Sequence, residues 1–274
     1  MPPAERLPAP ELVASPVPAL LRDGELTVEG RLVVASNATL LCRLSGSDGA
    51  GELRCVYKPV AGERPLWDFP DGTLAAREVA AYLVSEAAGW RLVPATILRD
   101  GPFGPGMCQL WIDHDGTELV DVVAPDAVPD GWVRVLDAVD EVGEPVALVH
   151  ADDPPLRRMA LFDLVVNNAD RKGGHVLVAP DAAVWGVDHG VCFHVDPKLR
   201  TVLWGWAGQP FTDAEQDALT ELAQGLRADL GDDLSAVLSA DEVAATAARV
   251  DGLLASGRFP GPATGRVPIP WPPF

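Results

Sequence analysis

The chain has 274 residues, of which 48% are hydrophobic and 22% charged, and this excludes a disordered protein. Its 21 basic and 40 acidic residues give a formal net charge of −19, which repels phosphate backbones and anionic headgroups, so we expect no nucleic-acid partner and no stable membrane association. The chain contains neither a secretion-signal pattern nor an apolar window long enough to span a bilayer, and its four cysteines form no C-x-x-C pair; we therefore expect a reduced, cytoplasmic protein.

The first half of the chain predicts a β-rich part with one helix. Residues 1–22 are rich in proline and are expected to be an extended segment, in which residues 18–22 favour a short helical turn. An amphipathic helix is predicted over residues 71–88, with Gly89 as its stop signal. Apolar runs with β-like patterning, bounded by turn residues, predict five strands, over residues 25–34, 38–46, 52–60, 91–101 and 106–116.

The second half predicts helices and one small hairpin. The hairpin consists of strands over 175–180 and 183–190, joined by a turn at Asp181-Ala182. The proline-rich residues 261–274 are expected to pack as an extended strap. Helices are predicted over residues 129–142, 154–168, 212–226 and 240–257.

The stretch NNADRKGGHVLVAPDAAVWGVDHG, residues 167–190, carries the most chemistry. Asp170 follows an apolar helix and Asp188 follows a short strand, 18 positions later. Two carboxylates joined by a loop and a hairpin can meet in one cleft. Phosphoryl transfer needs such a pair, because one carboxylate orients the attacking hydroxyl and accepts its proton while the other holds the magnesium ion.

This stretch resembles the catalytic loop and metal-binding segment of the phosphatidylinositol 3-/4-kinase-like superfamily. The family loop Asp-Arg-His-x-x-Asn corresponds to residues 170–175, and the family Asp-x-Gly corresponds to residues 188–190. The longer runs NNADRKGGHV and VDHGVCFH are similar to a family of actinobacterial kinase-like proteins. The resemblance covers about residues 24–210 and implies an α+β, bilobal protein-kinase-like fold.

This resemblance also implies how the chain divides. It predicts a β-rich N-lobe over residues 23–112, which binds the nucleotide phosphates, and a mainly helical C-lobe over residues 113–260, which carries the catalytic and metal loops. An N-terminal segment, 1–22, and a tail, 261–274, flank the two lobes.

The resemblance extends to the nucleotide site in the N-lobe. Lys58 matches the lysine that contacts ATP phosphates, and Glu78, 20 residues later, matches the glutamate that pairs with it. The remaining matches are Ser36, Asn37 and Thr39 in a phosphate-covering turn, and Gln109, Leu110 and Trp111 where the segment joining the lobes passes the adenine. Asp170 is then the base that orients the acceptor and Asp188 the metal ligand, with ATP and Mg²⁺, or Mn²⁺, as cofactors.

Two positions depart from the family pattern. His175 stands where the family has the magnesium-binding Asn, and imidazole is a poor ligand for this hard cation, so the metal or its affinity differs. Lys172 stands in place of the family His, where its ammonium can stabilise charge on the transferred group. Only three lysines occur among the 21 basic residues, which fits a specific use of this one.

Each candidate also has a purely structural interpretation. Lys58 and Glu78 can form a structural ion pair, Asp170 can be a loop carboxylate, Asp188 can cap a turn, and His175 can hold its loop by a hydrogen bond. The cluster of Asp188, His189, Cys192 and His194 suggests zinc, but its irregular spacing lacks a second ligand pair. P-loop, dinucleotide-binding and nucleophile-elbow motifs are absent from the sequence.

The favoured interpretation is an ATP-dependent kinase that transfers the γ-phosphoryl group to an alcohol. With a charge of −19 and no basic face in the sequence, a small molecule or a protein hydroxyl is a better acceptor than a membrane phosphoinositide. Two alternatives stay open: a nucleotide-binding pseudokinase that signals to a protein partner, which His175 favours, and an AMP transferase on the same scaffold.

Overall fold

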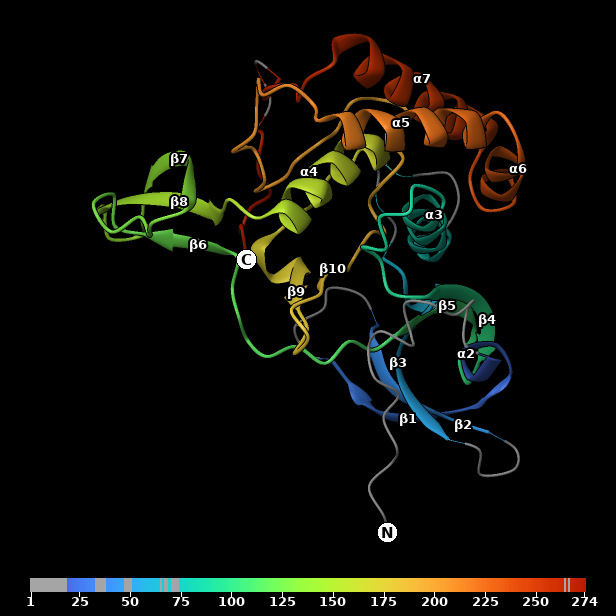
Figure 1. The fold of residues 1–274 in the computed structure, drawn as a ribbon. Coiled ribbons are helices and arrows are strands. Elements are labelled where there is room, and N and C mark those ends of the chain that lie inside the picture. The colour runs from blue at the N-terminus through green and yellow to red at the C-terminus, as the bar shows by residue number, and fades with distance from the viewer. Residues whose placement is uncertain are drawn as a thin grey trace.

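The structure is a computed structural model that describes residues 19–32, 38–46, 51–64, 66, 69, 74–263, 265 and 267–274. It contains a β-rich part and a helical part (Figure 1). A small hairpin lies between these two parts, and a second sheet lies beside the helical part. The β-rich part is a five-stranded antiparallel sheet in the order β1-β2-β3-β5-β4. Its strands are β1 (Glu25–Arg31), β2 (Leu40–Ser45), β3 (Glu52–Pro59), β4 (Thr96–Gly101) and β5 (Gly104–Leu110).

Helix α3 lies between this sheet and the helical part (Figure 1). It covers Leu74–Ala87, inside the predicted range, and Gly89 follows it with φ 64°. The short helix α2 (Ala19–Asp23) packs on the sheet, and the 3-10 turn η1 (Val60–Gly62) follows β3. The predicted five strands and one helix are confirmed, although β4 and β5 are shorter than predicted.

The helical part is built on α4, whose ends follow from its sequence. The Asp153 carboxylate accepts a hydrogen bond from the Leu156 N–H, two prolines occupy the first turn, and Asn167 ends the helix in the left-handed conformation. Capping boxes of Thr212 with Glu215 and of Ser239 with Glu242 begin α5 and α7. The helices are α4 (Pro154–Val166), α5 (Asp213–Leu226), α6 (Asp229–Ser235) and α7 (Ala240–Ser256).

The predicted hairpin is confirmed. Strands β9 (Val176–Val178) and β10 (Val184–Gly186) pair in an antiparallel register, preceded by the 3-10 turn η2 (Gly173–His175). The described residues of the tail 261–274 form neither helix nor strand, as expected.

The helix predicted over 129–142 is wrong. This segment forms β7 (Trp132–Val139), which pairs with β8 (Pro145–Ala151), and β8 also pairs with β6 (Val120–Val123). A β-bulge between Arg134 and Leu136 shifts the register, so the apolar residues of β7 do not alternate. The resulting three-stranded sheet projects from the helical part in Figure 1, and the predicted mainly helical second half therefore contains a second sheet.

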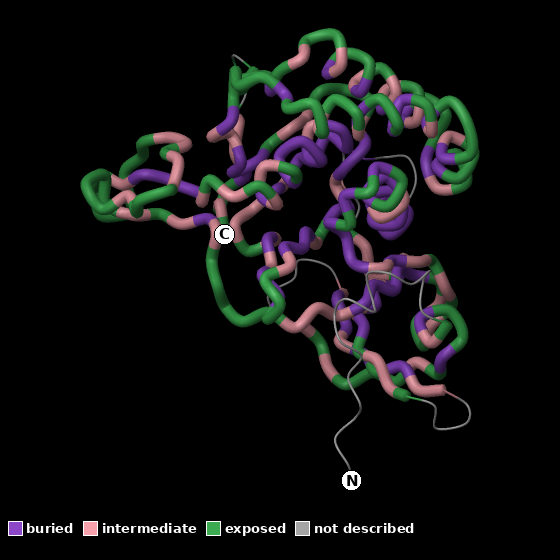
Figure 2. The backbone as a smooth tube through the Cα atoms, viewed as in Figure 1, coloured by how far each residue is buried: buried purple, intermediate pink, exposed green. Residues whose placement is uncertain are grey.

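Two buried clusters form the core. The larger surrounds α4 and includes side chains from α3, α5 and α7; the smaller lies between the five-stranded sheet and α2, around Leu21, Tyr57 and three cysteines. Figure 2 shows the buried residues concentrated along α3 and α4. Helix α3 thus lies at the centre of the molecule, where it packs against the sheet on one side and helices on the other.

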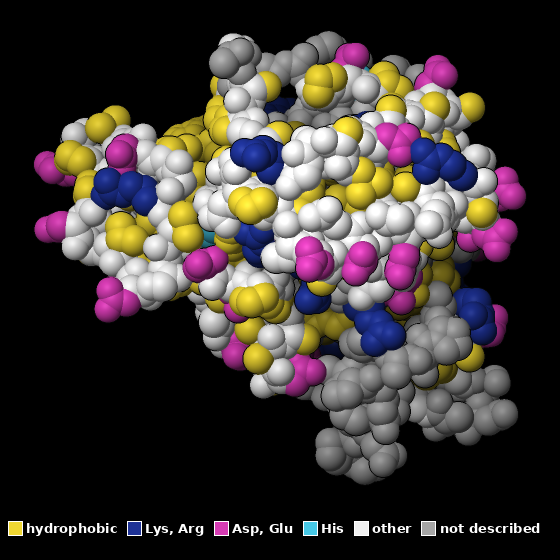
Figure 3. Space-filling view, turned by 45° about the horizontal axis from the view of Figure 1, so that its top comes forward, with side chains coloured by type: hydrophobic (Ala, Val, Ile, Leu, Met, Phe, Trp, Pro, Cys, Tyr) yellow, Lys and Arg dark blue, Asp and Glu magenta, His cyan; other side chains and the backbone are white. Residues whose placement is uncertain are grey.

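Acidic and basic side chains are mixed on the face shown in Figure 3. Acidic side chains lie at its upper, left and right edges and across its front, with basic side chains between them. Within the described part of the chain, none of the helices combines the length and the apolar character needed to cross a membrane.

Candidate active site

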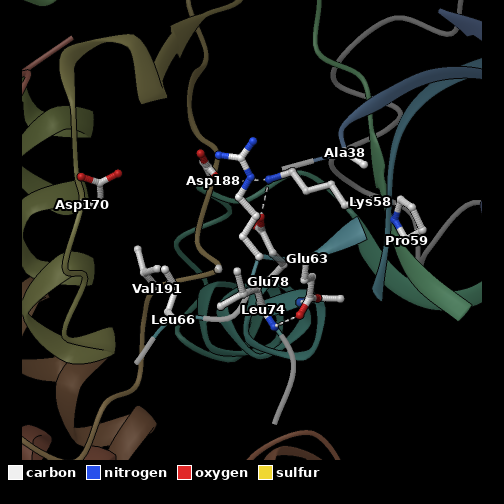
Figure 4. A pocket seen from close by; sticks show the side chains of 13 residues that line it. Ala38, Lys58, Pro59, Glu63, Leu66, Leu74, Glu78, Asp170, Asp188 and Val191 are labelled. Carbon is white, nitrogen blue, oxygen red and sulfur yellow. Dashed lines mark hydrogen bonds and ion pairs between the residues drawn. The ribbon is translucent and has the colours of Figure 1, made fainter. Parts of the chain in front are cut away.

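Lys58 joins the two parts of the molecule. It extends from β3, and its Nζ lies 2.7 Å from Glu78 Oε1 on α3 and 2.9 Å from Asp188 Oδ1 after β10 (Figure 4). The Glu78 side chain is 1% exposed and that of Lys58 is 19% exposed, whereas the Asp188 side chain is 53% exposed. One ammonium thus pairs with a buried and an accessible carboxylate at the same time.

Lys58, Glu78 and Asp188 form a trio whose charges depend on one another. Burial opposes the charge on Lys58, but Asp188 and Glu78 outweigh it and raise the pKa of the ammonium. The same ammonium holds the pKa of Asp188 far below its usual range. Burial raises the pKa of Glu78 against the attraction of Lys58. Lys58 and Asp188 are therefore ionised at neutral pH, with Asp188 as an anion in the cleft.

The backbone presents Asp188 to Lys58 in a conformation that few side chains adopt. Asp188 has φ 63°, in the left-handed region, where Asp is one of the better-tolerated residues. Its second oxygen, Oδ2, lies 3.5 Å from Nε2 of His175. Burial lowers the pKa of His175 to about 4, so the imidazole is neutral at neutral pH. Its Nδ1 is buried and has no hydrogen-bond partner among the residues that the structure describes.

Both oxygens of Glu78 are used. While Oε1 accepts from Lys58, Oε2 accepts a hydrogen bond of 2.8 Å from the His189 backbone N–H. Because His189 directly follows Asp188, Glu78 also fixes the segment that carries the accessible carboxylate. The predicted Lys58–Glu78 pair is therefore formed, and it is connected to the Asp188 segment by two hydrogen bonds.

Asp170 is held just beyond the end of α4. The Asn168 side chain donates a hydrogen bond to Asp163 and accepts one of 2.9 Å from the Asp170 N–H. Burial raises the pKa of Asp170, which makes its carboxylate a stronger base. Lys172 Nζ lies 4.0 Å from Asp170 Oδ2, so these two predicted residues lie side by side.

One pocket brings the main candidates together. It has a volume of about 370 Å³, and in Figure 4 Asp170 lies across it from Lys58. Glu63 also lines it, and its carboxylate accepts hydrogen bonds from the Leu74 and Ala75 N–H groups at the start of α3. Glu63 could not be predicted from the sequence, because a cap placed 11 residues before its helix follows no local motif. The main lining residues are Ala38, Lys58, Pro59, Glu63, Arg64, Leu66, Leu74, Glu78, Asp170, Asp188 and Val191.

A buried network beneath the pocket was also missed by the sequence analysis. The Arg171 guanidinium bonds the Asp163 carboxylate at 3.0 Å and Nε2 of His189 at 2.7 Å, and all three side chains are fully buried. His189 Nε2 accepts from Arg171, so the imidazole is neutral with its proton on Nδ1, and burial lowers its pKa well below the usual value. The network ties the loop of Asp170 to the segment of Asp188.

Among the other predicted nucleotide contacts, those that the structure describes do not line this pocket. The Gln109 amide is buried and donates to the Thr96 hydroxyl, Leu110 is buried, and the Trp111 indole donates to Asp113. Thr39 is buried beside Ala38, and its carbonyl accepts from the Leu32 N–H. Ser36 and Asn37 lie outside the described residues.

The residues present fit a divalent cation that is shared with a nucleotide. Within the described ranges, no three His, Cys, Asp or Glu side chains form a cluster able to hold a metal, which also removes support for zinc at Asp188, His189, Cys192 and His194. Magnesium sites in nucleotide enzymes need only one or two protein oxygens, since phosphates and waters complete the shell. The anionic, accessible Asp188 could supply such an oxygen, and Nε2 of His175 lies 3.5 Å from its Oδ2.

The comparisons with known proteins give a family and a fold. The chain is 54% identical over 266 residues to Protein Rv2133c of Mycobacterium tuberculosis, covering 93% of this chain and 95% of that protein. The chain belongs to the Rv2133c family. No family model matches it.

Among solved structures, the fold of this Rv2133c family member is similar to that of a protein kinase. The crystal structure of the Golgi casein kinase with Mn/ADP bound has a TM-score of 0.52 at 12% identity, and the match covers 86% of this chain and 73% of that one. The Helicobacter pylori proinflammatory kinase CtkA matches with a TM-score of 0.45 at 12% identity, over 87% of this chain and 94% of that one. The predicted kinase-like α+β fold is confirmed.

Proposed function

We propose that this protein transfers the γ-phosphoryl group of ATP to an alcohol. The observation that carries the proposal is the position of Lys58 between Glu78 and Asp188, with Asp170 lining the same pocket. A cation fixed by a buried carboxylate, an accessible anion for a metal and a second carboxylate across the pocket are the parts that phosphoryl transfer requires. The kinase-like fold supports the same conclusion.

Lys58 would contact the nucleotide phosphates, and Glu78 would hold it in place. Asp188, with His175 beside it, would bind the divalent cation, which when bound neutralises the charge of the phosphate oxygens. Manganese is a reasonable ion here, because His175 supplies nitrogen and magnesium prefers oxygen. The Golgi casein kinase carries manganese and ADP, which supports this choice.

Asp170 would orient the acceptor hydroxyl and take its proton. The hydroxyl oxygen then forms a bond to the γ-phosphorus, and the bond from that phosphorus to the β–γ bridging oxygen breaks, so ADP leaves with the electron pair. Lys172, 4.0 Å from Asp170, would stabilise the charge of the transferred group. The raised pKa of Asp170 suits a group that must accept a proton.

The acceptor is proposed to be a small alcohol or a protein hydroxyl. The likeness of the motifs to phosphatidylinositol kinases suggests a lipid, but a net charge of −19 disfavours an anionic membrane surface. Adenine recognition by Gln109, Leu110 and Trp111 is part of the same proposal. It is supported by their position at and directly after the end of β5, where Gln109 and Leu110 pair with Val56 and Cys55 of β3, the strand that carries Lys58.

The experiment is ATP consumption by the purified protein with Mg²⁺ or Mn²⁺, with mass spectrometry of the nucleotide products. ADP made by the wild type and lost in Asp188→Ala supports phosphoryl transfer. Pyrophosphate released in place of ADP would replace the proposal with transfer of AMP, because the AMP then stays on the acceptor, and the acceptor screen would look for that added AMP.

The second candidate is a nucleotide-binding pseudokinase, which His175 in the metal loop favours. Saturable ATP binding, measured by calorimetry, together with no turnover across a screen of small alcohols and protein substrates, would overturn the kinase proposal in its favour. A His175→Asn variant that gains turnover would point the same way.

A further inference from the structure

The loop that carries Asp170, Lys172 and His175 is held from two sides. Its first half is fixed by the body of the protein: the Arg171 N–H donates to the Arg200 carbonyl at 3.0 Å, and the Arg171 carbonyl accepts from the Val202 N–H at 3.1 Å. Its second half has a different partner. The Gly173 N–H donates a hydrogen bond of 2.8 Å to the carbonyl of Pro273, at the far end of the sequence.

The side chain of Phe274 sits directly on Gly173. A Cβ placed on Gly173 would lie only 2.7 Å from Cδ1 of the Phe274 ring and 3.1 Å from Cζ. These distances are too short for carbon atoms in van der Waals contact. The ring can therefore occupy this position only because residue 173 has no side chain. At Gly174, the next residue, an added Cβ would meet nothing within 4 Å.

The segment that brings Phe274 to the loop is anchored upstream. The Pro268 carbonyl accepts hydrogen bonds from the Thr201 N–H at 3.1 Å and from the Trp204 indole at 2.9 Å. Ile269 packs against the main core. Residues 268–274 thus cross from the segment that pairs with Arg171 to the second half of the loop, and in Figure 1 the end of the chain lies beside β9 and β10.

The composition of this segment suits a strap. Four of its seven residues are prolines, which have few conformations to lose on docking and lack an N–H of their own. Its described backbone contacts with Gly173 and Thr201 use proline carbonyls as acceptors. Phe274 is 45% exposed, so its ring covers the loop from outside and does not belong to either buried cluster.

We infer that residues 268–274 are a positioning strap, in which Phe274 on Gly173 sets the placement of Lys172 and His175 beside Asp170 and Asp188. The Lys172 carbonyl accepts from the His175 N–H, and the His175 carbonyl accepts from the Val187 N–H, one residue before Asp188. A displacement of Gly173 therefore shifts Lys172 and His175, and through Val187 it reaches the segment of Asp188. The effect on turnover rests on the proposed kinase function, whereas the effect on the loop does not.

The first test measures the loop itself. Amide hydrogen exchange at Gly173 in the full-length protein is compared between wild type, Phe274→Ala and Gly173→Ala. We expect exchange about tenfold faster in both variants, because without the ring seated on Gly173 the Pro273 carbonyl is no longer held against this amide. Gly174→Ala, which adds a methyl group in open space, keeps the wild-type exchange at Gly173. Unchanged exchange in Phe274→Ala would overturn the inference, whether or not the protein turns over ATP.

The second test separates positioning from folding. With ATP turnover as the readout, Phe274→Ala should lower kcat about tenfold and leave KM for ATP within about twofold, with a melting temperature close to wild type. Phe274→Tyr, which keeps the ring, should restore kcat. The control is Phe103→Ala, at the exposed turn between β4 and β5, with wild-type kcat. Equal kcat for Phe274→Ala and wild type would overturn the positioning role.

Discussion

Lys58 and Asp188 are 130 positions apart in the sequence, and Lys58 Nζ lies 2.9 Å from Asp188 Oδ1. This contact closes the molecule around its pocket, because Lys58 belongs to the five-stranded sheet and Asp188 follows the β9–β10 hairpin. The site therefore depends on a contact that forms only in the complete fold.

The trio can be tested by removing its cation. Lys58→Met leaves the carboxylates of Glu78 and Asp188 facing each other, and we expect a loss of about 2–3 kcal/mol in the free energy of unfolding and at least a hundredfold loss of ATP turnover. Urea unfolding and a nucleotide assay measure the two effects. Adding Glu78→Gln to Lys58→Met should recover unfolding free energy but not turnover. Full turnover in Lys58→Met would contradict the role of the ammonium.

Asp170 is tested by the isosteric Asp170→Asn. Loss of a general base typically lowers kcat by about 10²–10⁴-fold, and KM for ATP should change little, because Asp170 faces the acceptor. Since burial raises the pKa of Asp170, the wild-type rate should rise with pH through that pKa as the carboxylate loses its proton. The variant should lack this rise. Asp126→Asn, the same change at an exposed turn, serves as the control.

His175 is expected to shape the metal preference. With its nitrogen 3.5 Å from Asp188 Oδ2, the wild type should bind Mn²⁺ with ADP more tightly than Mg²⁺ with ADP, and His175→Asn should narrow that difference. Pulsed electron paramagnetic resonance of bound Mn²⁺ checks the donor directly, because a coordinated imidazole gives a nitrogen coupling. The same nitrogen signal in wild type and His175→Asn would show that His175 is not a ligand.

The buried pair of Arg171 and Asp163 is expected to be essential for stability. Both side chains are 0% exposed, so Asp163→Asn leaves a guanidinium in the core without its counter-charge and should cost about 3–5 kcal/mol of unfolding free energy. Denaturant unfolding measures it. The exposed pair of Arg227 and Asp251 provides the comparison, and Asp251→Asn should cost less than about 1 kcal/mol. Similar losses for the two variants would refute this difference.

His150 makes folding sensitive to acid. Its Nδ1 donates to the Ala151 carbonyl and its Nε2 accepts from the Gly205 N–H, so the neutral ring is fully bonded, and burial lowers its pKa. The unfolded chain takes up the proton first as the pH falls below the usual histidine value, so stability is lost on acidification from that value toward the lowered pKa. Urea midpoints at pH 7.5 and 5.5 should show a smaller drop for His150→Gln than for wild type.

Local sequence patterns predicted most elements, and the resemblance to a kinase family singled out four residues that line one pocket. The strands near Lys58, helix α3, α4 and the hairpin follow from short-range periodicity and caps, and Lys58, Glu78, Asp170 and Asp188 line one pocket as the motifs predicted. The order of strands and the meeting of Lys58 with Asp188 depend on long-range packing, which these patterns do not contain.

The error at β7 has a specific physical cause. Trp132, Val135, Leu136 and Val139 have the spacing of one helical face, because the bulge at Arg134/Leu136 interrupts the alternation of a normal strand. The β-branched valines of this segment favour a strand, as the structure shows. The Arg171–His189 contact was missed for another reason: nothing in the sequence distinguishes a buried arginine from a surface one.

The anchoring of α3 has a mechanical consequence. Arg77, next to Glu78, forms a buried ion pair with Glu242 of α7 and donates to the Cys192 carbonyl, so this helix is fastened to the helical part as well as packed on the sheet. A rotation of the sheet that leaves α3 in place would draw Lys58 away from Glu78 and Asp188 in a single movement. A rotation that carries α3 along must first break the Arg77–Glu242 pair. Glu78 and Asp188 would stay together in such a movement, because Glu78 accepts a hydrogen bond from the His189 N–H, and only Lys58 would move with the sheet.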